Sequence, residues 1–361
     1  MTYEIMHADT TVALLTDSGK CSLLKAAFLP WDLWLEESDD FDVRVNNMTN
    51  FYYWCATRVL TLDRVYAKEI LNSIGASQAA TDRDKAAIAL SYHCLTLTDV
   101  FWVRETQEKV SFKEINLYEN HLSNALVGIA LQGRHLTVEN AHLIATDVST
   151  GGVFPKAWVR REDGFWLYKD GSPDAVEREL LASRICRCFD CRQVVYTEAE
   201  FDGRKTTASR LMTGLSYSIA TREAFEIYAV NRGIDPLEYI LELDAHGFYM
   251  MNILDYLTGN SDRHWGNWGF LIDNASGEAV RLHDLMDFNQ CFKAYETLEG
   301  TACQPLFGRH ITQQQAAEQA VRADGLHQIS PVEEEWFGGH KDYYEMFSAR
   351  LKYLTGIAAG D

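Results

Sequence analysis

One short stretch of the chain carries side chains that suit phosphoryl chemistry. Residues 260–270 have the sequence Asn-Ser-Asp-Arg-His-Trp-Gly-Asn-Trp-Gly-Phe, which sets a carboxylate, Asp262, five positions before a carboxamide, Asn267. A second carboxylate, Asp287, comes later in the chain. Transfer of a phosphoryl group needs a carboxylate to orient the attacking hydroxyl and accept its proton, and hard oxygen ligands for magnesium. In this interpretation Asp262 is the base, and Asn267 and Asp287 hold the metal.

The elements on either side of this stretch are expected to bring the three side chains together. The apolar segment 248–257 has the spacing of a helix, which we expect to end at Gly259. Residues 268–272 are expected to form a strand, and residues 279–282 to return as its hairpin partner. Since a hairpin brings its two ends together, the candidate ligands before its start and after its finish should lie side by side.

The loop pattern Asp-x-x-x-x-Asn is a weak signal when it is taken alone. A helix cap followed by an ordinary hairpin would also produce it. The complete arrangement of apolar helix, loop, hairpin and second Asp is far rarer, and it favours the catalytic interpretation.

A glycine-containing turn upstream has features of a phosphate-binding loop. Glycines allow a close approach of the backbone, and free N–H groups in such a turn point at anions. Residues 153–159 and residues 165–169 are expected to form two strands, joined at the hairpin signal Asp163-Gly164. The turn itself consists of Ser149, Thr150, Gly151 and Gly152. A Gly-Gly pair is most often only a turn, so the interpretation depends on the strands and the lysine after it.

Lys169 ends the second of these strands. Strand alternation places it on the same face as Phe165 and Leu167. Its ammonium group therefore either reaches solvent at the strand end or points into a pocket. In a pocket behind a glycine turn and a hairpin, it suits the phosphate-pairing lysine of a kinase.

A helix with a strong start signal follows the second strand. Ser172 is suited to cap it, Pro173 to occupy its first position, and Asp174 to complement its N-terminus. The helix offers two acidic partners for the strand lysine, Glu177 and Glu179. Its apolar arc is broad and reaches both, so periodicity does not choose between them. A solvated helix face is the structural alternative for each.

Residues 255–271 resemble the catalytic loop of HipA-like kinases, which are bacterial serine/threonine protein kinases best known as toxins of toxin–antitoxin pairs. Residues 285–289, Leu-Met-Asp-Phe-Asn, are similar to the metal-binding segment of that family, the counterpart of Asp-Phe-Gly in other kinases. The family usually has Pro three residues before the metal-binding Asp, whereas this chain has Asp284 there. Both Asp284 and Asp287 are therefore candidates for the metal, and we prefer Asp287.

The same resemblance extends over the upstream segment. Residues 149–183 are similar to the amino-terminal lobe of HipA-like kinases. Residues 179–183 resemble the family's Glu-aliphatic-aliphatic-small-Ser helix, which favours Glu179 over Glu177. The glycine turn, strand lysine, helix glutamate, catalytic Asp, metal Asn and metal Asp also occur in the order expected of a bilobal kinase.

The resemblance implies an α+β, bilobal protein-kinase-like (HipA-like) fold with an additional N-terminal subdomain. The expected division is an N-terminal subdomain over residues 1–140, a kinase N-lobe over 141–212 and a mainly helical C-lobe over 213–361. Residues 209–212 are expected to lead into the hinge between the lobes.

The implied activity is the transfer of phosphate from ATP, with Mg²⁺, to a serine or threonine of a protein substrate. Lys169, held by Glu179, would align the phosphates of ATP against the glycine turn. His264 would support the catalytic loop through hydrogen bonds rather than react. Ser149 and Thr150 are candidates for autophosphorylation, which would add negative charge where ATP must bind and would suppress activity.

Two other functions remain open. The pattern Asp-Arg-His-x-x-Asn also occurs in phosphatidylinositol kinases, and Asp-x-x-x-x-Asn in antibiotic phosphotransferases, so a small-molecule or lipid kinase is one alternative. The phosphotransferases typically have His-Gly before the Asp, whereas this chain has Asn-Ser at 260–261. A catalytically inactive kinase-fold binding module is the other alternative. The joint presence of a strand lysine, the candidate base and both candidate metal ligands argues against it.

The composition limits the partners of the chain. It has 33 basic and 52 acidic side chains, which give a formal net charge of −19. Such a chain lacks the basic surface expected for direct nucleic-acid binding, and anionic membranes would repel it. A DNA-binding antitoxin, a candidate partner by resemblance, would make any DNA contact in its place. No secretory h-region opens the sequence and no apolar run approaches the ~20 residues of a membrane span, so we expect a soluble, cytoplasmic protein.

Three of the eight cysteines form a cluster, at positions 186, 188 and 191. The spacing lacks the second Cys pair or the His pair of a zinc site, so we expect buried thiols near the end of a helix. Elsewhere, apolar periodicity predicts a helix over residues 86–99 and an amphipathic helical ending over residues 333–354 that packs on the larger lobe.

Overall fold

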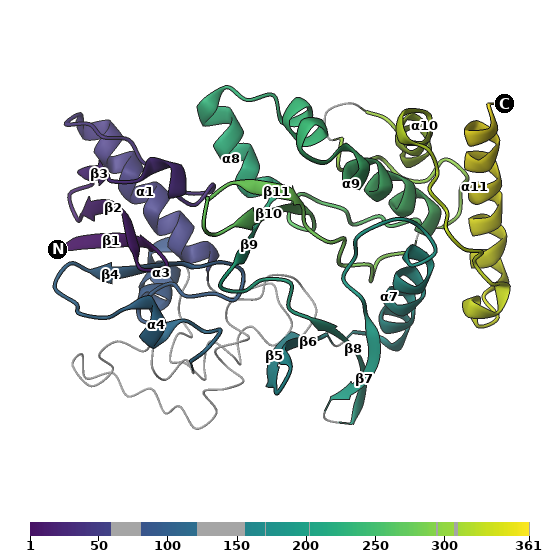
Figure 1. Cartoon of the computed structure of the whole chain (residues 1–361), viewed down its shortest axis with the longest axis horizontal. Coiled ribbons are helices and arrows are strands. Elements are labelled where there is room, and N and C mark those ends of the chain that lie inside the picture. Colours follow the sequence, from purple (N-terminus) through teal and green to yellow (C-terminus); the bar gives the residue numbers. More distant parts are fainter. Residues whose placement is uncertain are drawn as a thin grey trace.

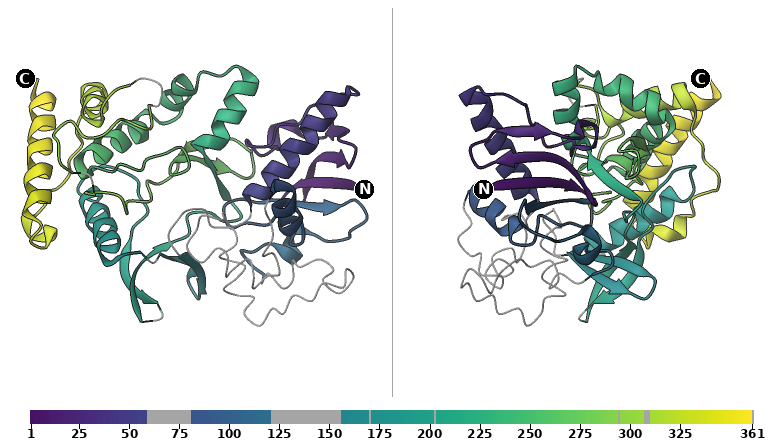
Figure 2. Two further views of the ribbon diagram at one scale, coloured as in Figure 1. Left: turned by 180° about the vertical axis from the view of Figure 1, so that it is seen from behind. Right: turned by 60° about the vertical axis from the view of Figure 1, so that its left-hand side comes forward.

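The computed structural model describes residues 1–58, 81–120, 156–169, 171–201, 203–293, 295–306 and 310–360. Over these ranges the chain is a mixed α/β protein with antiparallel sheets (Figure 1). The strand orders are β3-β2-β1-β4, β5-β6-β8-β7 and β11-β10-β9. The first sheet lies at one end of the longest axis and the C-terminal helix at the other, as the views of Figure 2 also show.

The first sheet and its helices form the N-terminal part of the molecule. Its strands are β1 (Thr2–His7), β2 (Thr10–Thr16), β3 (Cys21–Leu23) and β4 (Phe101–Glu105). The helical segments are η1 (Ala26–Phe28), α1 (Phe41–Thr57), α3 (Asp82–Leu90) and α4 (Phe112–Ile115). One apolar core, with Ile5, Phe51 and Trp54 fully buried, joins the sheet to α1.

The predicted helix over residues 86–99 is too long. The helix α3 ends at Leu90, and His93 and Cys94 then adopt left-handed backbone conformations with φ of 59° and 57°. Two successive residues with positive φ turn the chain back, so that the N–H of Cys94 donates to the carbonyl of Ala89. The apolar residues that follow serve the core from a loop rather than from a helix face.

The second sheet contains the predicted hairpin. Its strands are β5 (Lys156–Arg161), β6 (Gly164–Lys169), β7 (Thr197–Phe201) and β8 (Arg204–Arg210). Arg161 pairs with Gly164 at the turn between β5 and β6, while residues 153–155 of the predicted first strand lie outside the described residues. The helix α7 (Pro173–Cys186) packs against β8. It begins as predicted, because the Ser172 side chain accepts from the N–H of Ala175 at 3.2 Å.

The third sheet and the C-terminal helices form the largest part. The strands are β9 (Tyr217–Thr221), β10 (Gly269–Asp273) and β11 (Ala279–Leu282). The helices are α8 (Arg222–Arg232), α9 (Pro236–Thr258), α10 (Gln313–Asp324), η2 (Glu334–Phe337) and α11 (Lys341–Ala359). Pairing of Phe270 with Leu282 confirms the predicted β10–β11 hairpin, to which β9 adds a third strand that the sequence analysis missed.

Two apolar clusters hold these parts together. The larger one is built around the buried second half of α9 and takes in Trp268, Phe270 and Leu354. A smaller one contains Trp102 of β4 and Phe165 of β6, so it joins the first sheet to the second. Among the described helices, none combines the length and the apolar composition that crossing a bilayer requires.

Three cysteines near the end of α7 are free thiols. Cys186 and Cys188 are buried, as predicted, and Cys191 is partly exposed. The thiol of Cys191 donates to the carbonyl of Cys186 at 3.2 Å, and that of Cys188 to the carbonyl of Pro331 at 3.4 Å. These thiols are satisfied by backbone oxygens, as small buried hydrophobic residues with a weak donor would be.

Candidate functional site

The loop that carries Asp262 starts where α9 ends. Gly259 closes the helix in the left-handed conformation, with φ of 60°, and its N–H donates to the carbonyl of Tyr256. A Cβ at this position would lie only 2.3 Å from the ring of Tyr295. Glycine is therefore required both for the backbone conformation and for the space beside the ring. The predicted helix end at Gly259 is correct. The element α9 starts at Pro236 but is kinked at Asp244, so the helical segment that ends at Gly259 begins close to the expected residue 248.

Arg263 fixes this loop in place. Its side chain is 1% exposed, and its Nε lies 3.0 Å from Oδ2 of Asp255, a buried carboxylate in the last turns of α9. Its Nη1 donates to the backbone carbonyl of Asn267 at 2.9 Å and to that of Met286 at 2.6 Å. One guanidinium thus ties the helix end, the loop and the segment before Asp287 together.

Arg263 and Asp255 carry no motif that predicts a role for them from the sequence. A signal was present, since Asp255 is a carboxylate within an otherwise apolar helical stretch, Ile253–Leu257. A charge buried on such a face must have a partner, and an arginine eight positions later in the following loop can supply it.

Hydrogen bonds shape the loop around Asp262. The side chain of Asn260 accepts from the N–H of Asp262 at 3.1 Å. The side-chain nitrogen of Asn267 donates to the backbone carbonyl of Asp262 at 2.9 Å. His264 is exposed, and its Nδ1 accepts from the N–H of Gly266 at 3.0 Å. The ring of His264 therefore contacts the backbone of the turn between the two candidate site residues, and its supporting role in catalysis stays a prediction.

The carboxylate of Asp262 is left uncommitted. It is half-buried and accepts no hydrogen bond from any residue that the structure describes. Burial raises the pKa of Asp262, and the negative charge of Asp287 adds to the rise, whereas the charges of His264, Arg263 and Lys169 oppose it. The carboxylate of Asp262 can therefore accept a hydrogen bond from an external hydroxyl, and it lies close enough to Asp287 for the charge of Asp287 to raise its pKa.

Lys169 connects the second sheet with the segment after β11. The lysine is 6% exposed, and its Nζ donates to Oε1 of Glu179 at 2.9 Å and to Oδ1 of Asp287. Burial opposes its charge, but the two carboxylates outweigh burial and raise the pKa of Lys169. The alternative in which Lys169 reaches solvent at the strand end is therefore wrong.

Glu179 is the acidic residue of α7 that contacts Lys169. It is buried, and its second oxygen accepts from the hydroxyl of Thr207 in β8 at 2.7 Å. Glu177 is exposed and lies 3.7 Å from the ammonium of Lys205 instead. Of the two partners that helical periodicity left open, the structure selects Glu179.

Asp287 rather than Asp284 contacts Lys169. Asp284 pairs with Arg281 at 2.8 Å, close to the end of β11. Asp287 has a left-handed backbone with φ of 60°, and its N–H donates to the hydroxyl of Tyr196 at 3.0 Å. This conformation, uncommon for a residue other than Gly, turns the Asp287 carboxylate to the ammonium.

The oxygen atoms near Asp287 suit a hard cation. Asn289 is buried, and its side-chain nitrogen donates to Oδ1 of Asp287 at 2.7 Å. Its side-chain oxygen is buried without a hydrogen-bond partner among the described residues. Asn267 supplies a carboxamide whose nitrogen donates to the backbone carbonyl of Asp262, and Arg263 ties its backbone to that of Met286, next to Asp287. Carboxylate and carboxamide oxygens are the ligands that Mg²⁺ takes, so the set fits that ion.

Asn289 had no assigned role in the sequence analysis. The sequence places Asn289 in the segment 285–289, which resembles a metal-binding segment. The burial of Asn289 and the lack of a described partner for its side-chain oxygen are seen only in the structure. The candidate phosphate loop, Ser149, Thr150, Gly151 and Gly152, lies outside the described residues.

Comparison with solved structures places the fold. One similar structure is that of the Shewanella oneidensis MR-1 toxin–antitoxin system, which contains HipA, HipB and operator DNA. The match covers 99% of this chain and 98% of that chain, with a TM-score of 0.55 and 12% sequence identity. The proinflammatory kinase CtkA of Helicobacter pylori matches over 58% of this chain and 91% of its own, with a TM-score of 0.43 and 15% identity. No protein-family model and no curated protein matches the sequence.

The likeness to the HipA-containing structure extends over almost the whole chain, including its N-terminal part. The protein therefore has a bilobal protein-kinase-like fold with an additional N-terminal subdomain. Since the identity is 12%, this likeness concerns the fold.

Proposed function

We propose that this protein is an ATP- and Mg²⁺-dependent serine/threonine protein kinase of the HipA-like type. The observation that carries the proposal is the contact of Lys169 with both Glu179 and Asp287. A kinase needs its phosphate-binding lysine, the glutamate that holds it and its metal-binding aspartate at one place. These three residues come from β6, from α7 and from the segment after β11, and the kinase-like fold supports the same interpretation.

Lys169 binds the phosphates of ATP in this proposal. Its ammonium stays charged, because the raised pKa of Lys169 keeps the proton on the nitrogen. When ATP binds, phosphate oxygens replace Asp287 as one partner of the ammonium. Glu179, itself held by Thr207, keeps the ammonium in position throughout. The exchange leaves the carboxylate of Asp287 for the metal.

Asp287, Asn267 and the unpaired oxygen of Asn289 are the groups that would hold Mg²⁺. Bound Mg²⁺ supplies positive charge that offsets the charge of the phosphates during transfer. The guanidinium of Arg263 keeps the loop of Asn267 and the segment of Asp287 together, since it binds a carbonyl of each.

Asp262 acts on the acceptor hydroxyl. Its carboxylate orients the serine or threonine and takes the hydroxyl proton as the hydroxyl oxygen bonds to the γ-phosphorus. The bond between that phosphorus and the β,γ-bridging oxygen breaks, and ADP leaves. Burial raises the pKa of Asp262, which makes its carboxylate a stronger base than an exposed one.

The proposal includes the wider features that the family resemblance implies. These are a toxin role in a bacterial cytoplasm, a DNA-binding antitoxin as partner, and autophosphorylation at Ser149 or Thr150. The similar Shewanella structure contains HipA with HipB and operator DNA, which supports an antitoxin partner. We propose the division into residues 1–140, 141–212 and 213–361 on the same basis.

Transfer of γ-labelled phosphate from Mg·ATP tests the activity. The acceptors are total cellular protein, the protein itself, and a panel of small alcohols with phosphatidylinositol. We expect label on protein serine or threonine, loss of label in Asp262→Asn, and retention in Glu177→Gln, whose side chain is exposed. Label on small alcohols or lipid alone would identify a small-molecule or lipid kinase. ATP consumption no higher than that of Asp262→Asn would identify an inactive binding module.

Phosphopeptide mapping after incubation with ATP tests the autophosphorylation. Modification at Ser149 or Thr150 is expected in the active protein and absent in Asp262→Asn. An unmodified loop in a protein that phosphorylates other substrates would refute this part of the proposal alone.

A further inference from the structure

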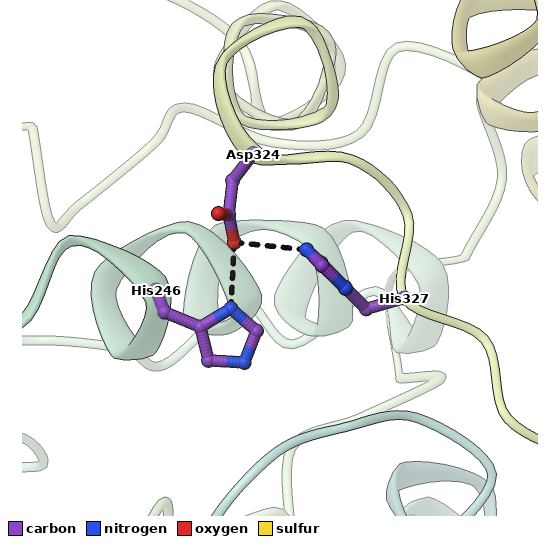
Figure 3. Close-up of side chains that lie close together, drawn as sticks. All are labelled: His246, Asp324 and His327. Carbon is purple, nitrogen blue, oxygen red and sulfur yellow. Dashed lines mark hydrogen bonds and ion pairs between the residues drawn. The ribbon is translucent and has the colours of Figure 1, made fainter.

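Three potential metal ligands lie together outside the candidate kinase site (Figure 3). His246 belongs to α9, Asp324 is the last residue of α10, and His327 follows in the next turn. Nδ1 of His246 lies 2.6 Å from Oδ2 of Asp324, and Nε2 of His327 lies 3.2 Å from the same oxygen. The ligand atoms of all three lie within 4.8 Å of one another. We call these residues the α9–α10 cluster.

The hydrogen bond of His246 Nε2 shows whether His246 Nδ1 carries a proton. Nε2 of His246 lies 2.8 Å from the backbone carbonyl oxygen of Asp190. A carbonyl oxygen only accepts hydrogen bonds, so Nε2 must carry a proton. In the neutral ring, Nδ1 then presents a lone pair to the carboxylate of Asp324. Two acceptors face each other at this distance only with a cation between them, which is either a second proton or a metal ion.

Without a metal ion, a second proton lies between Nδ1 of His246 and the carboxylate of Asp324. Burial opposes the charged ring, but the hydrogen bonds to Asp324 and to the Asp190 carbonyl prevail and raise the pKa of His246. An outer hydrogen bond from a ring N–H to a backbone carbonyl is also what metal-binding histidines have, because it fixes the tautomer that coordinates the ion.

The spacing of the cluster suits a small coordination sphere. In a tetrahedral zinc site, bonds of about 2.0–2.2 Å place neighbouring ligand atoms about 3.3–3.5 Å apart. The His327–Asp324 distance of 3.2 Å already approaches this value, and the His246–Asp324 distance of 2.6 Å would lengthen by less than about 1 Å. The side chains of His246, Asp324 and His327 are 35%, 27% and 35% exposed, so solvent can supply a further ligand.

The backbone holds both histidines independently of any ion. The N–H of Asp190 donates to the carbonyl of His327 at 2.9 Å, and the carbonyl of Asp190 accepts from His246. Gly325, with φ of 98°, and His327, with φ of 49°, turn the chain directly after α10. The two rings meet edge to face, with centroids 4.8 Å apart. The ligands are therefore brought together by α9, by the end of α10 and by the segment after α7.

We propose that His246, Asp324 and His327 bind one divalent transition-metal ion, with Zn²⁺ as the favoured ion and water as the remaining ligand. Two imidazoles and one carboxylate form a set that Zn²⁺ and its first-row neighbours take, whereas Mg²⁺ prefers oxygen ligands alone. The ion links α9 to the turn after α10 and so stiffens the helix from which the Asp262 loop emerges. The site is separate from the candidate kinase site and does not depend on it.

Titration of the full-length, chelator-treated protein with Co²⁺, without nucleotide, tests the proposal. Cobalt in a low-coordinate site of nitrogen and oxygen ligands absorbs visible light, and Zn²⁺ should displace it. We expect one Co²⁺ ion to bind per chain and excess Mg²⁺ not to displace it. The affinity for Co²⁺ should be at least about tenfold weaker in His246→Ala and in His327→Asn than in the wild type. Asparagine tolerates the left-handed backbone of position 327, so that variant should fold.

His310→Asn is the matched control. His310 is exposed and has a similar backbone, with φ of 46°, but lies outside the α9–α10 cluster. Its substitution should leave cobalt absorption unchanged, and Zn²⁺ should raise the melting temperature of the wild type and of this control but not of His327→Asn. Absence of bound metal in the wild type, or equal binding in His327→Asn and the control, would overturn the proposal and leave a proton-linked His–Asp–His group. Neither result bears on kinase activity, because no nucleotide is present.

Discussion

The residues around Lys169 and the α9–α10 cluster both gather charged groups from distant parts of the chain, but they differ in their access to water. Lys169, Glu179 and Arg263 are nearly fully buried, and each has a carboxylate or an ammonium as partner. The members of the α9–α10 cluster are about one third exposed. A buried charge without its partner carries a large desolvation cost, whereas an exposed one is solvated by water. Substitutions should therefore have much larger effects in the first region than in the second.

The largest expected effect is on activity. Asp262→Asn should lower the rate of phosphoryl transfer about 10²–10⁴-fold, because the amide cannot accept the hydroxyl proton. Stability should change little, since the Asp262 carboxylate makes no hydrogen bond within the described residues. Steady-state kinetics with urea unfolding as a control measures both quantities. A variant that unfolds more easily but keeps its rate would contradict the assignment of Asp262 as the base.

Removal of the Arg263 guanidinium should have the largest effect on stability. Arg263→Met leaves Asp255 buried without its partner and should lower the free energy of unfolding by about 3–5 kcal/mol. The double variant Arg263→Met/Asp255→Leu removes both charges and should recover part of the loss. Urea unfolding of the two variants makes the comparison. Equal loss in both would mean that the backbone contacts of Arg263, rather than the ion pair, stabilise the loop.

Buried His283 should make stability depend on pH. Burial lowers the pKa of His283 to about 4, below its unfolded value of about 6.5, so the unfolded chain binds an extra proton between these values. Stability contributed by the neutral ring is complete above the unfolded pKa and is lost as pH falls toward 4, by on the order of 3 kcal/mol. Urea unfolding from pH 7 to pH 4 measures the loss, and the slope should be smaller in His283→Asn. The same slope in that variant would assign the dependence to other groups.

Glu179 and Glu177 offer a matched pair on one helix. Glu179→Gln weakens a buried, charge-assisted bond to Lys169 and should lower both stability, by about 1–3 kcal/mol, and the rate of phosphoryl transfer. Glu177→Gln changes an exposed side chain and should alter stability by no more than about 0.5 kcal/mol. Thermal unfolding and the labelled-phosphate assay measure both. Similar effects of the two substitutions would refute the selection of Glu179.

The smallest effect is expected in the α9–α10 cluster without metal. His327→Asn removes a partly exposed contact with the carboxylate of Asp324 and should change the stability of chelator-treated protein by no more than about 1 kcal/mol. Urea unfolding in chelator measures the change. If His327→Asn lowered the free energy of unfolding as much as Arg263→Met, the partly exposed cluster would not differ from the buried residues around Lys169 in its contribution to stability.

Local patterns predicted much of the fold. The β5–β6 hairpin, the Ser172 cap of α7, the Gly259 end of α9 and the β10–β11 hairpin each depend on short-range chemistry and are confirmed. The strands β1–β4, β7, β8 and β9 were not predicted from the sequence. In β9, five residues with no turn signal of their own gain their strand conformation from pairing with β10. The helix over residues 86–99 was extended too far, because the left-handed turn at 93–94 has no glycine to mark it.

The candidate site was predicted less completely, and its catalytic roles stay predictions. The order of motifs identified Lys169 and Asp287, but their contact spans 118 positions and is formed only by folding. Periodicity left Glu177 and Glu179 equivalent, since it describes which face of a helix is apolar and not which acid meets a distant lysine. Arg263 and Asn289 gained their importance from burial, which one sequence does not reveal for polar side chains.

The two carbonyl contacts of Arg263 constrain how the protein can move. One rigid, planar group holds the Asp262–Asn267 loop and the approach to Asp287 at a constant separation. The part of the chain that carries Lys169 holds the same segment from the other side, through the Lys169 ammonium, the hydroxyl of Tyr196 and the side chain of Arg178. Asp287 therefore lies in a segment that is held from two sides, and a change in the position of either side would displace its carboxylate.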